Sequence, residues 1–460
     1  MQIIETSEML SAFLTDFHTS DSIIIPIFTD HRAHPAVNKL YLIYIHLIKH
    51  NTSFIIPINT EDCINISPEL ITEILFKLAN NSTNKYVLDK KVFHYIYDSY
   101  NLELDKKIYD IRVLEYVSNG KVDYSIIDRI TTSAHSFIYY RFFRMSDLNA
   151  AISISKHCER LDLLTDYILS ILDKYKFNIM SEAFKQINGV MISVLFNLEK
   201  SGIYVNDDFK RRDLVHNNLV YGEYNLFTLT NRPSCTSQGY SFSSINKTDG
   251  SRKSFVSRFG NNGELVLLDY HSYHIYLIAD IIGEKFSENP HSYLAKLYLG
   301  KDTISEEEYE QCKEITFNIL YGGIPSEFKQ IDFFKKVDKF VNELWNAYNS
   351  DKFIFTKYFK RKLYKENLPD INPQKLFNYY LQALETENNM LLLDMLFQYI
   401  NSSGYKSKVI LYIYDAILID FNYEDGKEFI DGVLRILEQN NRFPMGLSHG
   451  KNYHDLVKIS

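Results

Sequence analysis

Residues 265–270 read LVLLDY, and residues 409–420 read VILYIYDAILID. Both runs have the length and the apolar, aromatic composition that are typical of buried β-strands. Asp269 closes the first run, and Asp415 interrupts the second. A carboxylate in such surroundings is costly unless it is paired or binds a metal ion. We therefore expect the two aspartates to lie on adjacent strands and to act together.

A third segment lies between these runs, where residues 313–323 read KEITFNILYGG. Lys313, Phe317 and Tyr321 are spaced four residues apart, which places them on one face of a helix in a stripe about 12 Å long. An ordinary amphipathic helix ended by glycine would show the same spacing. Together with two strand carboxylates, however, the segment suits nucleotidyl transfer with two Mg²⁺ ions, because Mg²⁺ prefers hard oxygen ligands.

The order of the three segments resembles motifs A, B and C of the family A (polymerase I-like) DNA polymerases. The resemblance implies that Asp269, Asp415 and Lys313 are catalytic, with the two aspartates as ligands of both Mg²⁺ ions and the lysine at the triphosphate. The substrate-binding residues that it implies are Phe317, Tyr321, Tyr270, His274 and Tyr309.

Four residues in three places depart from the usual motifs of that family. Tyr309 stands where relatives carry an arginine, and His274 where they carry a glutamate that closes off the 2′ position of the sugar. The third motif reads Tyr414-Asp415-Ala416 instead of His-Asp-Glu. A divergent virus- or phage-type subset is similar at these places. Selection between ribose and deoxyribose stays open.

Flanking segments resemble the DNA-contacting parts of the same family. Residues 228–234 read TLTNRPS, like T-x-T-G-R-x-S, and residues 249–258 resemble the approach to motif A. A helix over 377–387 resembles the N-x-x-x-Q helix that contacts the minor groove. A solvated basic loop would explain 249–258 equally well. The DNA-binding residues implied are Arg232, Arg252, Lys253, Arg258, Asn378 and Gln382.

The resemblance implies an α/β (α+β) chain with a right-hand polymerase fold of palm, fingers and reduced thumb. A ribonuclease H-like, exonuclease-type domain over 1–175 would precede the polymerase domain over 176–460. The expected parts are a palm at about 180–284 and 371–460, a minimal thumb of one or two short helices at about 200–225, and all-α fingers at about 285–370. Further expectations are one or two helices over 371–400, a β-hairpin over 405–422 and an amphipathic helix over 425–440.

In the N-terminal part we expect strands at 22–28, 40–48 and 53–58, helices at 69–79 and 90–99, and a long helical stretch over 148–200. A proofreading exonuclease needs its own carboxylates, beginning with D-x-E on the first strand. That strand contains none, and Asp30 lies just beyond it; Asp89 and Asp162 lie near the places of the second and third expected aspartates. We expect this domain to be catalytically inactive.

Composition limits the remaining possibilities. The chain has 460 residues and a formal net charge of −8, which excludes a globally basic nucleic-acid coat but not a locally positive channel. Its four cysteines show no C-x-x-C spacing, and no run of 18 apolar residues or signal-peptide pattern is present. We expect a protein that is cytoplasmic (host cell cytoplasm if viral), not secreted and without a membrane partner.

The sequence thus favours a DNA-templated DNA polymerase that extends a primer 3′-hydroxyl with dNTPs, in viral or phage DNA replication or repair and without proofreading. Its partners would be primer-template DNA, dNTPs and a processivity or replication partner. Two alternatives stay open. One is a non-catalytic, polymerase-like DNA-binding scaffold of a replication complex, and the other is a polymerase that accepts ribonucleotides.

Overall fold

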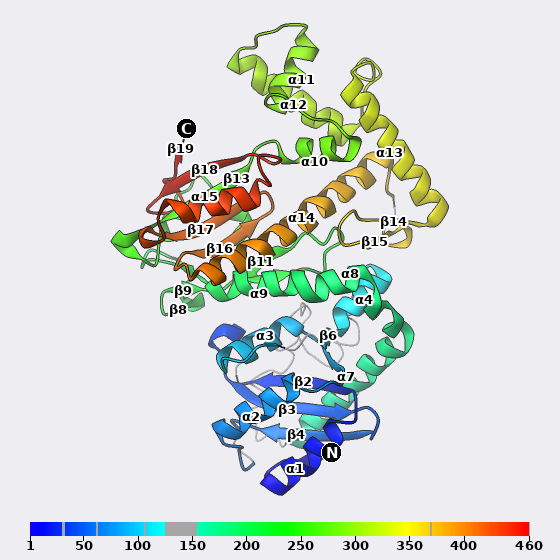
Figure 1. Ribbon diagram of the computed structural model, residues 1–460, viewed down its shortest axis with the longest axis vertical. Coiled ribbons are helices and arrows are strands. Elements are labelled where there is room, and N and C mark those ends of the chain that lie inside the picture. The colour runs from blue at the N-terminus through cyan, green and yellow to red at the C-terminus, as the bar shows by residue number, and fades with distance from the viewer. Residues whose placement is uncertain (30–32, 61–62, 105–106, 125–153, 369, 460) are drawn as a thin grey trace. The chain divides into compact units, whose positions relative to one another are not determined.

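The computed structural model describes residues 1–29, 33–60, 63–104, 107–124, 154–368 and 370–459. The chain divides into two compact units (Figure 1). The first comprises Met1–Lys200 with Ser237–Tyr240, and the second comprises Ser201–Thr236 with Ser241–Ser460. Among the described helices, none is both long enough and apolar enough to span a bilayer.

The first unit is built on a six-stranded sheet in the order β1-β4-β3-β2-β5-β6. Strands β2, β3 and β4 pair antiparallel, whereas β1 joins β4, and β5 and β6 follow β2, in parallel. The strands are β1 (Gln2–Ile3), β2 (Ser22–Phe28), β3 (Leu40–Leu47), β4 (Thr52–Pro57), β5 (Lys85–Val87) and β6 (Ile108–Asp110). The three expected strands are confirmed as β2, β3 and β4.

The helices of this unit begin where the sequence supplies capping side chains. Ser67 caps α2, and Asp89 and Asp110 cap α3 and α4, each by accepting hydrogen bonds from backbone N–H groups of the first turn. The helices are α1 (Ser7–Phe17), α2 (Pro68–Ala79), α3 (Lys90–Ser99), α4 (Ile111–Asn119), α7 (Ile154–Tyr175), α8 (Glu182–Lys185) and α9 (Ile192–Ser201). The helices expected at 69–79 and 90–99 are confirmed as α2 and α3.

The long helical stretch expected over 148–200 is interrupted rather than continuous. A 3₁₀ turn (Lys176–Met180) separates α7 from α8, and a π-helical turn (Gln186–Met191) joins α8 to α9. Residues 148–153 lie outside the described residues.

The second unit contains a five-stranded antiparallel sheet in the order β16-β17-β13-β18-β19. Its strands are β13 (Gly263–Tyr270), β16 (Lys408–Ile413), β17 (Ala416–Asn422), β18 (Met445–Gly450) and β19 (Val457–Ile459). The hairpin expected over 405–422 is confirmed as β16–β17. The helix expected over 425–440 is confirmed as α15 (Gly426–Leu437).

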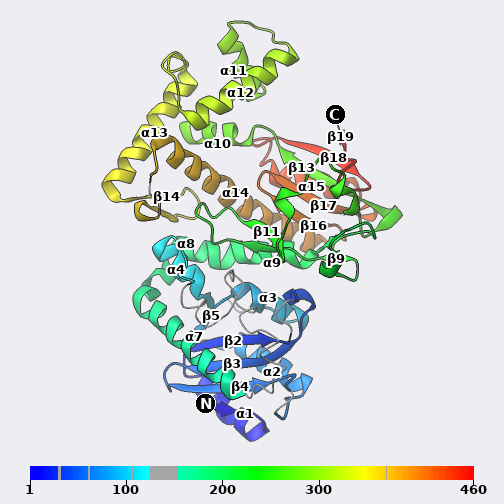
Figure 2. The same cartoon turned by 180° about the vertical axis from the view of Figure 1, so that it is seen from behind.

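One continuous helix, α14 (Pro373–Ser403), packs against α10, α12, α13 and α15 (Figures 1 and 2). Asn372 caps its first turn, Pro373 occupies the first helical position, and Gly404 ends it in the left-handed conformation. The segment 371–400, expected to form one helix or two, therefore forms one.

The region expected to be all-α fingers contains three helices and one unexpected β-hairpin. The helices are α11 (Pro290–Leu299), α12 (Glu306–Gly322) and α13 (Asp332–Asp351), and α10 (Tyr273–Ile282) precedes them. Strands β14 (Phe353–Phe355) and β15 (Lys362–Tyr364) follow. The all-α expectation is wrong for these residues, because Lys352 ends α13 at φ 65° and the next residues alternate between buried and exposed.

The segment at 200–225 also differs from its expectation. It forms a small sheet of β7 (Ile203–Tyr204), β9 (Leu219–Val220) and β8 (Val215–His216), with only a 3₁₀ turn at Arg212–Leu214. The expected short α-helices are absent from these described residues. Asn217 and Asn218 both have positive φ, which is the signature of a type I′ turn joining two strands. Next come β10 (Glu223–Asn225) and β11 (Ser234–Ser237).

Candidate active site

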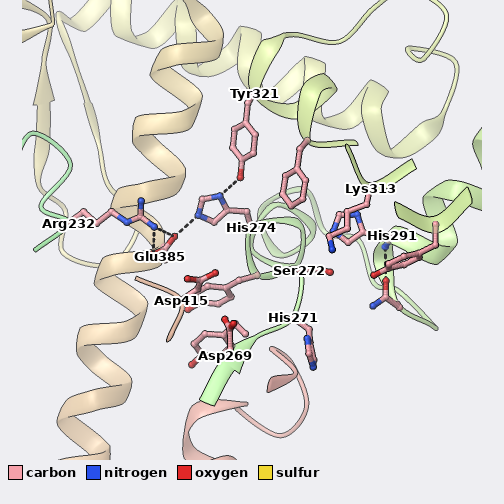
Figure 3. A pocket seen from close by; sticks show the side chains of 15 residues that line it. Arg232, Asp269, His271, Ser272, His274, His291, Lys313, Tyr321, Glu385 and Asp415 are labelled. Atoms are coloured by element: carbon pink, nitrogen blue, oxygen red, sulfur yellow. Dashed lines mark hydrogen bonds and ion pairs between the residues drawn. The ribbon is translucent and has the colours of Figure 1, made fainter. Parts of the chain in front are cut away.

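The sheet of the second unit brings the two predicted aspartates together. Asp269 lies near the end of β13, where it pairs in register with Ala416 at the start of β17. Asp415 belongs to the two-residue turn between β16 and β17, and its carbonyl oxygen accepts a 3.1 Å hydrogen bond from the backbone N–H of Tyr270. Figure 3 shows both carboxylates at one edge of the same cavity.

The turn that carries Asp415 is held in a conformation that costs energy. Tyr414 has φ 60°, a left-handed conformation that costs a non-glycine residue roughly 1 kcal/mol. Asn389 on α14 donates a 2.9 Å hydrogen bond to the Tyr414 carbonyl, and the Arg232 guanidinium lies 3.6 Å from the centre of its ring. These contacts fix the turn and with it the Asp415 side chain.

Both carboxylates have pKa values above their ordinary range. Loss of hydration, with repulsion from Asp415, raises the pKa of Asp269 to about 6, although its side chain keeps access to the cavity. Loss of hydration and the negative charge of Glu385 raise the pKa of Asp415. The pair is therefore a concentration of negative charge that a cation would stabilise.

The donor set fits a hard divalent cation. Mg²⁺ is commonly bound through one or two carboxylates, with water and substrate phosphates completing its shell. Within the described ranges no cluster of three or more His, Cys, Asp or Glu side chains is arranged to enclose a metal ion. A cation held by Asp269 and Asp415 would consequently depend on oxygen atoms of the substrate.

Helix α12 forms the opposite wall of the cavity and presents the predicted stripe. The rings of Phe317 and Tyr321 stack with centroids 5.9 Å apart and planes 5° from parallel. Lys313 lies one turn earlier, with its Nζ 5.8 Å from the centre of the Tyr309 ring. The cavity measures about 360 Å³ and is lined by Arg232, Asp269, Tyr270, His271, Ser272, Tyr273, His274, Asn289, His291, Tyr309, Lys313, Phe317, Tyr321, Glu385 and Asp415.

A chain of polar contacts crosses this cavity (Figure 3). His274 Nδ1 lies 2.5 Å from the Tyr321 hydroxyl, and its Nε2 lies 2.5 Å from Glu385 Oε2. Arg232 Nη2 donates to Glu385 Oε1 at 3.1 Å. Glu385 is 1% exposed and Arg232 25% exposed. The network ties the start of α10, the end of α12 and the middle of α14 to the segment at 228–234.

For several of the residues that line the cavity, the sequence analysis predicted no role in the site. Glu385 lies at helical spacing from Asn378 and Gln382 in the helix expected over 377–387, but no role was predicted for it. His291 begins α11 from a buried position, and burial together with the charge of Lys313 lowers its pKa to about 4. Asn289, His271 and Ser272 carried no local signal.

The predicted DNA-binding residues are placed unevenly. Arg232 lies in the cavity wall, and Asn378 donates to the Tyr321 carbonyl at 3.4 Å, whereas Gln382 is half-buried on α14 and does not line the cavity. Lys253 is exposed. The two predicted arginines near it form hydrogen bonds within the protein.

Two of the predicted arginines bind the protein itself. The Arg252 guanidinium is buried, donates to the Ile245 carbonyl and lies 4.3 Å from the centre of the Tyr453 ring. Arg258 donates to Asp420 Oδ2 and to the Gly202 carbonyl, both at 2.7 Å. Neither lines the cavity.

The two exonuclease candidates that lie within the described residues, Asp89 and Asp162, have separate protein partners. Asp89 caps α3 and pairs with Arg112 at 2.7 Å, where both side chains are nearly buried. Asp162 lies on α7, 3.5 Å from the Tyr44 hydroxyl. Asp30 lies outside the described residues.

Comparison with known proteins gives a structural match and no sequence match. No protein-family model and no curated protein matches this chain. Among solved structures, it is similar to the POL domain of Pol1 from M. smegmatis, which was solved with a DNA primer-template and dNTP. The match has a TM-score of 0.70 at 14% identity and covers 98% of this chain and 99% of that one. The mixed α/β fold of a polymerase domain is thereby confirmed.

Proposed function

We propose that the chain is a DNA-templated DNA polymerase of the family A type. The observation that carries the proposal is the cavity itself, in which Asp269 on β13 and Asp415 in the β16–β17 turn face a helix bearing Lys313, Phe317 and Tyr321. The structural neighbour, bound to primer-template and dNTP, supports the same reading at the level of the fold. The departures from the usual family motifs at Tyr309, His274 and residues 414–416 support a further part of the proposal, that it acts in viral or phage DNA replication or repair.

Each wall of the cavity would have a separate task. The α12 wall would receive the nucleotide, with Lys313 neutralising the triphosphate and the stacked rings of Phe317 and Tyr321 beside the base pair being formed. Arg232, held by Glu385 and by the Tyr414 ring, would contact the primer-template minor groove. The primer 3′-hydroxyl would attack the α-phosphate between these walls, and pyrophosphate would leave.

Asp269 and Asp415 would hold the divalent cations. When bound, two Mg²⁺ ions supply activation of the primer hydroxyl and stabilisation of charge on the triphosphate. The aspartates contribute by being fixed side by side, Asp269 on β13 and Asp415 in the β16–β17 turn, so that binding the cations requires little rearrangement of the protein. Their raised pKa values indicate that the site favours a cation over an empty pair of negative charges.

We propose further that the first unit is a ribonuclease H-like domain without exonuclease activity. Its six-stranded sheet, in which β2, β3 and β4 are antiparallel and β5 and β6 extend β2 in parallel, supports this type of domain. The absence of catalysis is supported by Asp89, whose carboxylate pairs with Arg112 and accepts hydrogen bonds from the backbone of α3. The polymerase would therefore work without proofreading.

Extension of a labelled primer-template with dNTPs and Mg²⁺ tests the proposed activity. Wild type should extend the primer, whereas Asp269→Asn and Asp415→Asn should each abolish extension and still bind primer-template. Asp431→Asn serves as a matched control, because Asp431 lies on α15 outside the cavity. Primer-template binding without extension by wild type would instead favour a non-catalytic scaffold. Faster extension with rNTPs would favour the ribonucleotide alternative.

A further inference from the structure

The β14–β15 hairpin has a composition unlike the rest of the chain. Residues 352–365 contain six basic residues, five aromatic residues and no acidic residue, within a chain of net charge −8. The basic residues are Lys352, Lys357, Lys360, Arg361, Lys362 and Lys365, and the aromatic ones are Phe353, Phe355, Tyr358, Phe359 and Tyr364. Such a segment attracts polyanions electrostatically.

The two faces of the hairpin differ. Ile354 and Leu363, which pair across the strands, are buried against a cluster that includes Tyr348, Leu376 and Tyr380. Because side chains alternate along a strand, the neighbouring residues point to the other face. That outer face consists of two cross-strand pairs, Phe353 with Tyr364 and Phe355 with Lys362.

The outer face forms a small aromatic platform around a lysine. The Phe353 ring centroid lies 5.1 Å from that of Phe355 and 6.1 Å from that of Tyr364. Lys362 Nζ lies 4.4, 5.7 and 6.0 Å from the centres of the Phe353, Phe355 and Tyr364 rings. Phe355 is 52% exposed, which is unusual for so large an apolar side chain.

The hairpin is anchored to elements that wall the cavity. Lys357 pairs with Asp280 of α10 at 2.6 Å, and Glu387 of α14 accepts two backbone N–H donors from the hairpin, both at 3.0 Å. Arg361 donates to the Leu229 carbonyl at 2.9 Å. The platform is therefore held at a fixed position relative to the cavity within the second unit.

We propose that this outer face binds unpaired nucleotides of the template strand, a role that rests on the proposed polymerase function. A base would stack on the exposed ring of Phe355, and Lys360 and Lys362 would face phosphates. Aromatic rings interleaved with cations bind single strands because every base offers a π-face, whereas the bases of a duplex are stacked on one another. The positive charge of the segment complements the nucleic-acid backbone.

The first test measures binding of a fluorescein-labelled oligothymidine by anisotropy, without nucleotides or extension. Phe355→Ala should raise its Kd about tenfold, since stacking of one base is typically worth ~1–3 kcal/mol. Phe355→Leu should bind the oligothymidine as weakly as Phe355→Ala does, and Phe355→Trp should bind it at least as tightly as wild type. Tyr423→Ala is the matched control, because Tyr423 is also exposed (43%) with Lys451 Nζ 4.9 Å from its ring centre. Its Kd should stay within twofold.

A second test compares a primer-template carrying a 5′ template overhang with a blunt duplex of the same paired length. Phe355→Ala should weaken binding of the overhang substrate and leave the blunt duplex unchanged. An unaltered oligothymidine Kd in Phe355→Ala, or equal losses on both substrates, would overturn the proposal. If wild type binds oligothymidine through Phe355 but does not extend a primer, the polymerase proposal fails and the single-strand platform stands.

Discussion

Among the described residues that line the cavity, Glu385 is the carboxylate with hydrogen bonds to other side chains. Replacing it should distinguish the contribution of its charge from that of its shape. An ionised carboxylate only accepts hydrogen bonds, so His274 Nε2 donates to it, and with a neutral imidazole Nδ1 accepts from the Tyr321 hydroxyl. In Glu385→Gln, the amide oxygen can still accept from Arg232 while its NH₂ donates to His274. The imidazole then changes tautomer and donates to Tyr321, so that both His274 contacts and the 3.1 Å bond from Arg232 survive without the charge, and only the 3.4 Å bond from Arg232 to the second oxygen is lost.

Two variants at this position, Glu385→Gln and Glu385→Leu, should therefore differ in stability. Charged hydrogen bonds contribute roughly 1 kcal/mol more than neutral ones, which for two bonds gives about 2 kcal/mol in Glu385→Gln. Because Arg232 is a quarter exposed, we expect about 1–2 kcal/mol. Glu385→Leu removes both acceptors and leaves a partly buried guanidinium without its carboxylate, which should cost about 3 kcal/mol.

Urea unfolding followed by tryptophan fluorescence measures this difference. The sole tryptophan, Trp345, lies on α13 and packs against the core cluster of the second unit, so it reports on the unit that contains Glu385. The expected order of stability is wild type, then Glu385→Gln, then Glu385→Leu. A leucine variant as stable as the glutamine variant would show that Arg232 and His274 do not depend on this carboxylate, and would refute the reasoning.

Three further predictions follow from single contacts. Burial lowers the pKa of His94 to about 3, so between this value and the ordinary 6.5 only the unfolded chain is protonated at this histidine. The folded state therefore loses stability as pH falls below 6.5, by up to about 3 kcal/mol at pH 4.5. His94→Phe should make the urea midpoint less dependent on pH on the acid side, and the same pH dependence in both proteins would contradict this. Lys352→Gly should stabilise the second unit by about 0.5–1 kcal/mol, because φ 65° suits glycine, and a lower urea midpoint would count against it. His274→Glu should reduce primer extension by opposing Glu385 with a like charge, and the added change Glu385→Gln should restore it; no rescue in the double variant would show that charge is not the cause.

The sequence predicted those parts of the site that depend on local pattern. Apolar runs with an embedded aspartate identified β13 and β16–β17, and a four-residue spacing identified the α12 stripe. The role of Glu385 was not predicted, because it depends on His274 and Arg232, which are more than a hundred residues away in the sequence. Only packing of α10 against α14 creates that contact.

The errors have similar physical causes. Strands of two or three residues, such as β7, β8, β14 and β15, are too short to show a period, and their turns were not recognised. Basic residues pose a different difficulty, because a sequence does not distinguish a solvated arginine from one that is buried. Arg252 and Arg258 were expected to face DNA, yet their guanidiniums bind Ile245 and Asp420.

Helix α14 makes three of the contacts that shape the cavity, from Asn378 to Tyr321, from Glu385 to His274 and from Asn389 to Tyr414. These donors and acceptors are spaced seven and four residues apart, so they follow one stripe of the helix. Inserting or deleting a single residue between them would turn one end by about 100° and displace it by about 1.5 Å relative to the other. Relatives of this protein can therefore vary in sequence along this helix, but the number of residues between positions 378 and 389 should stay at its present value.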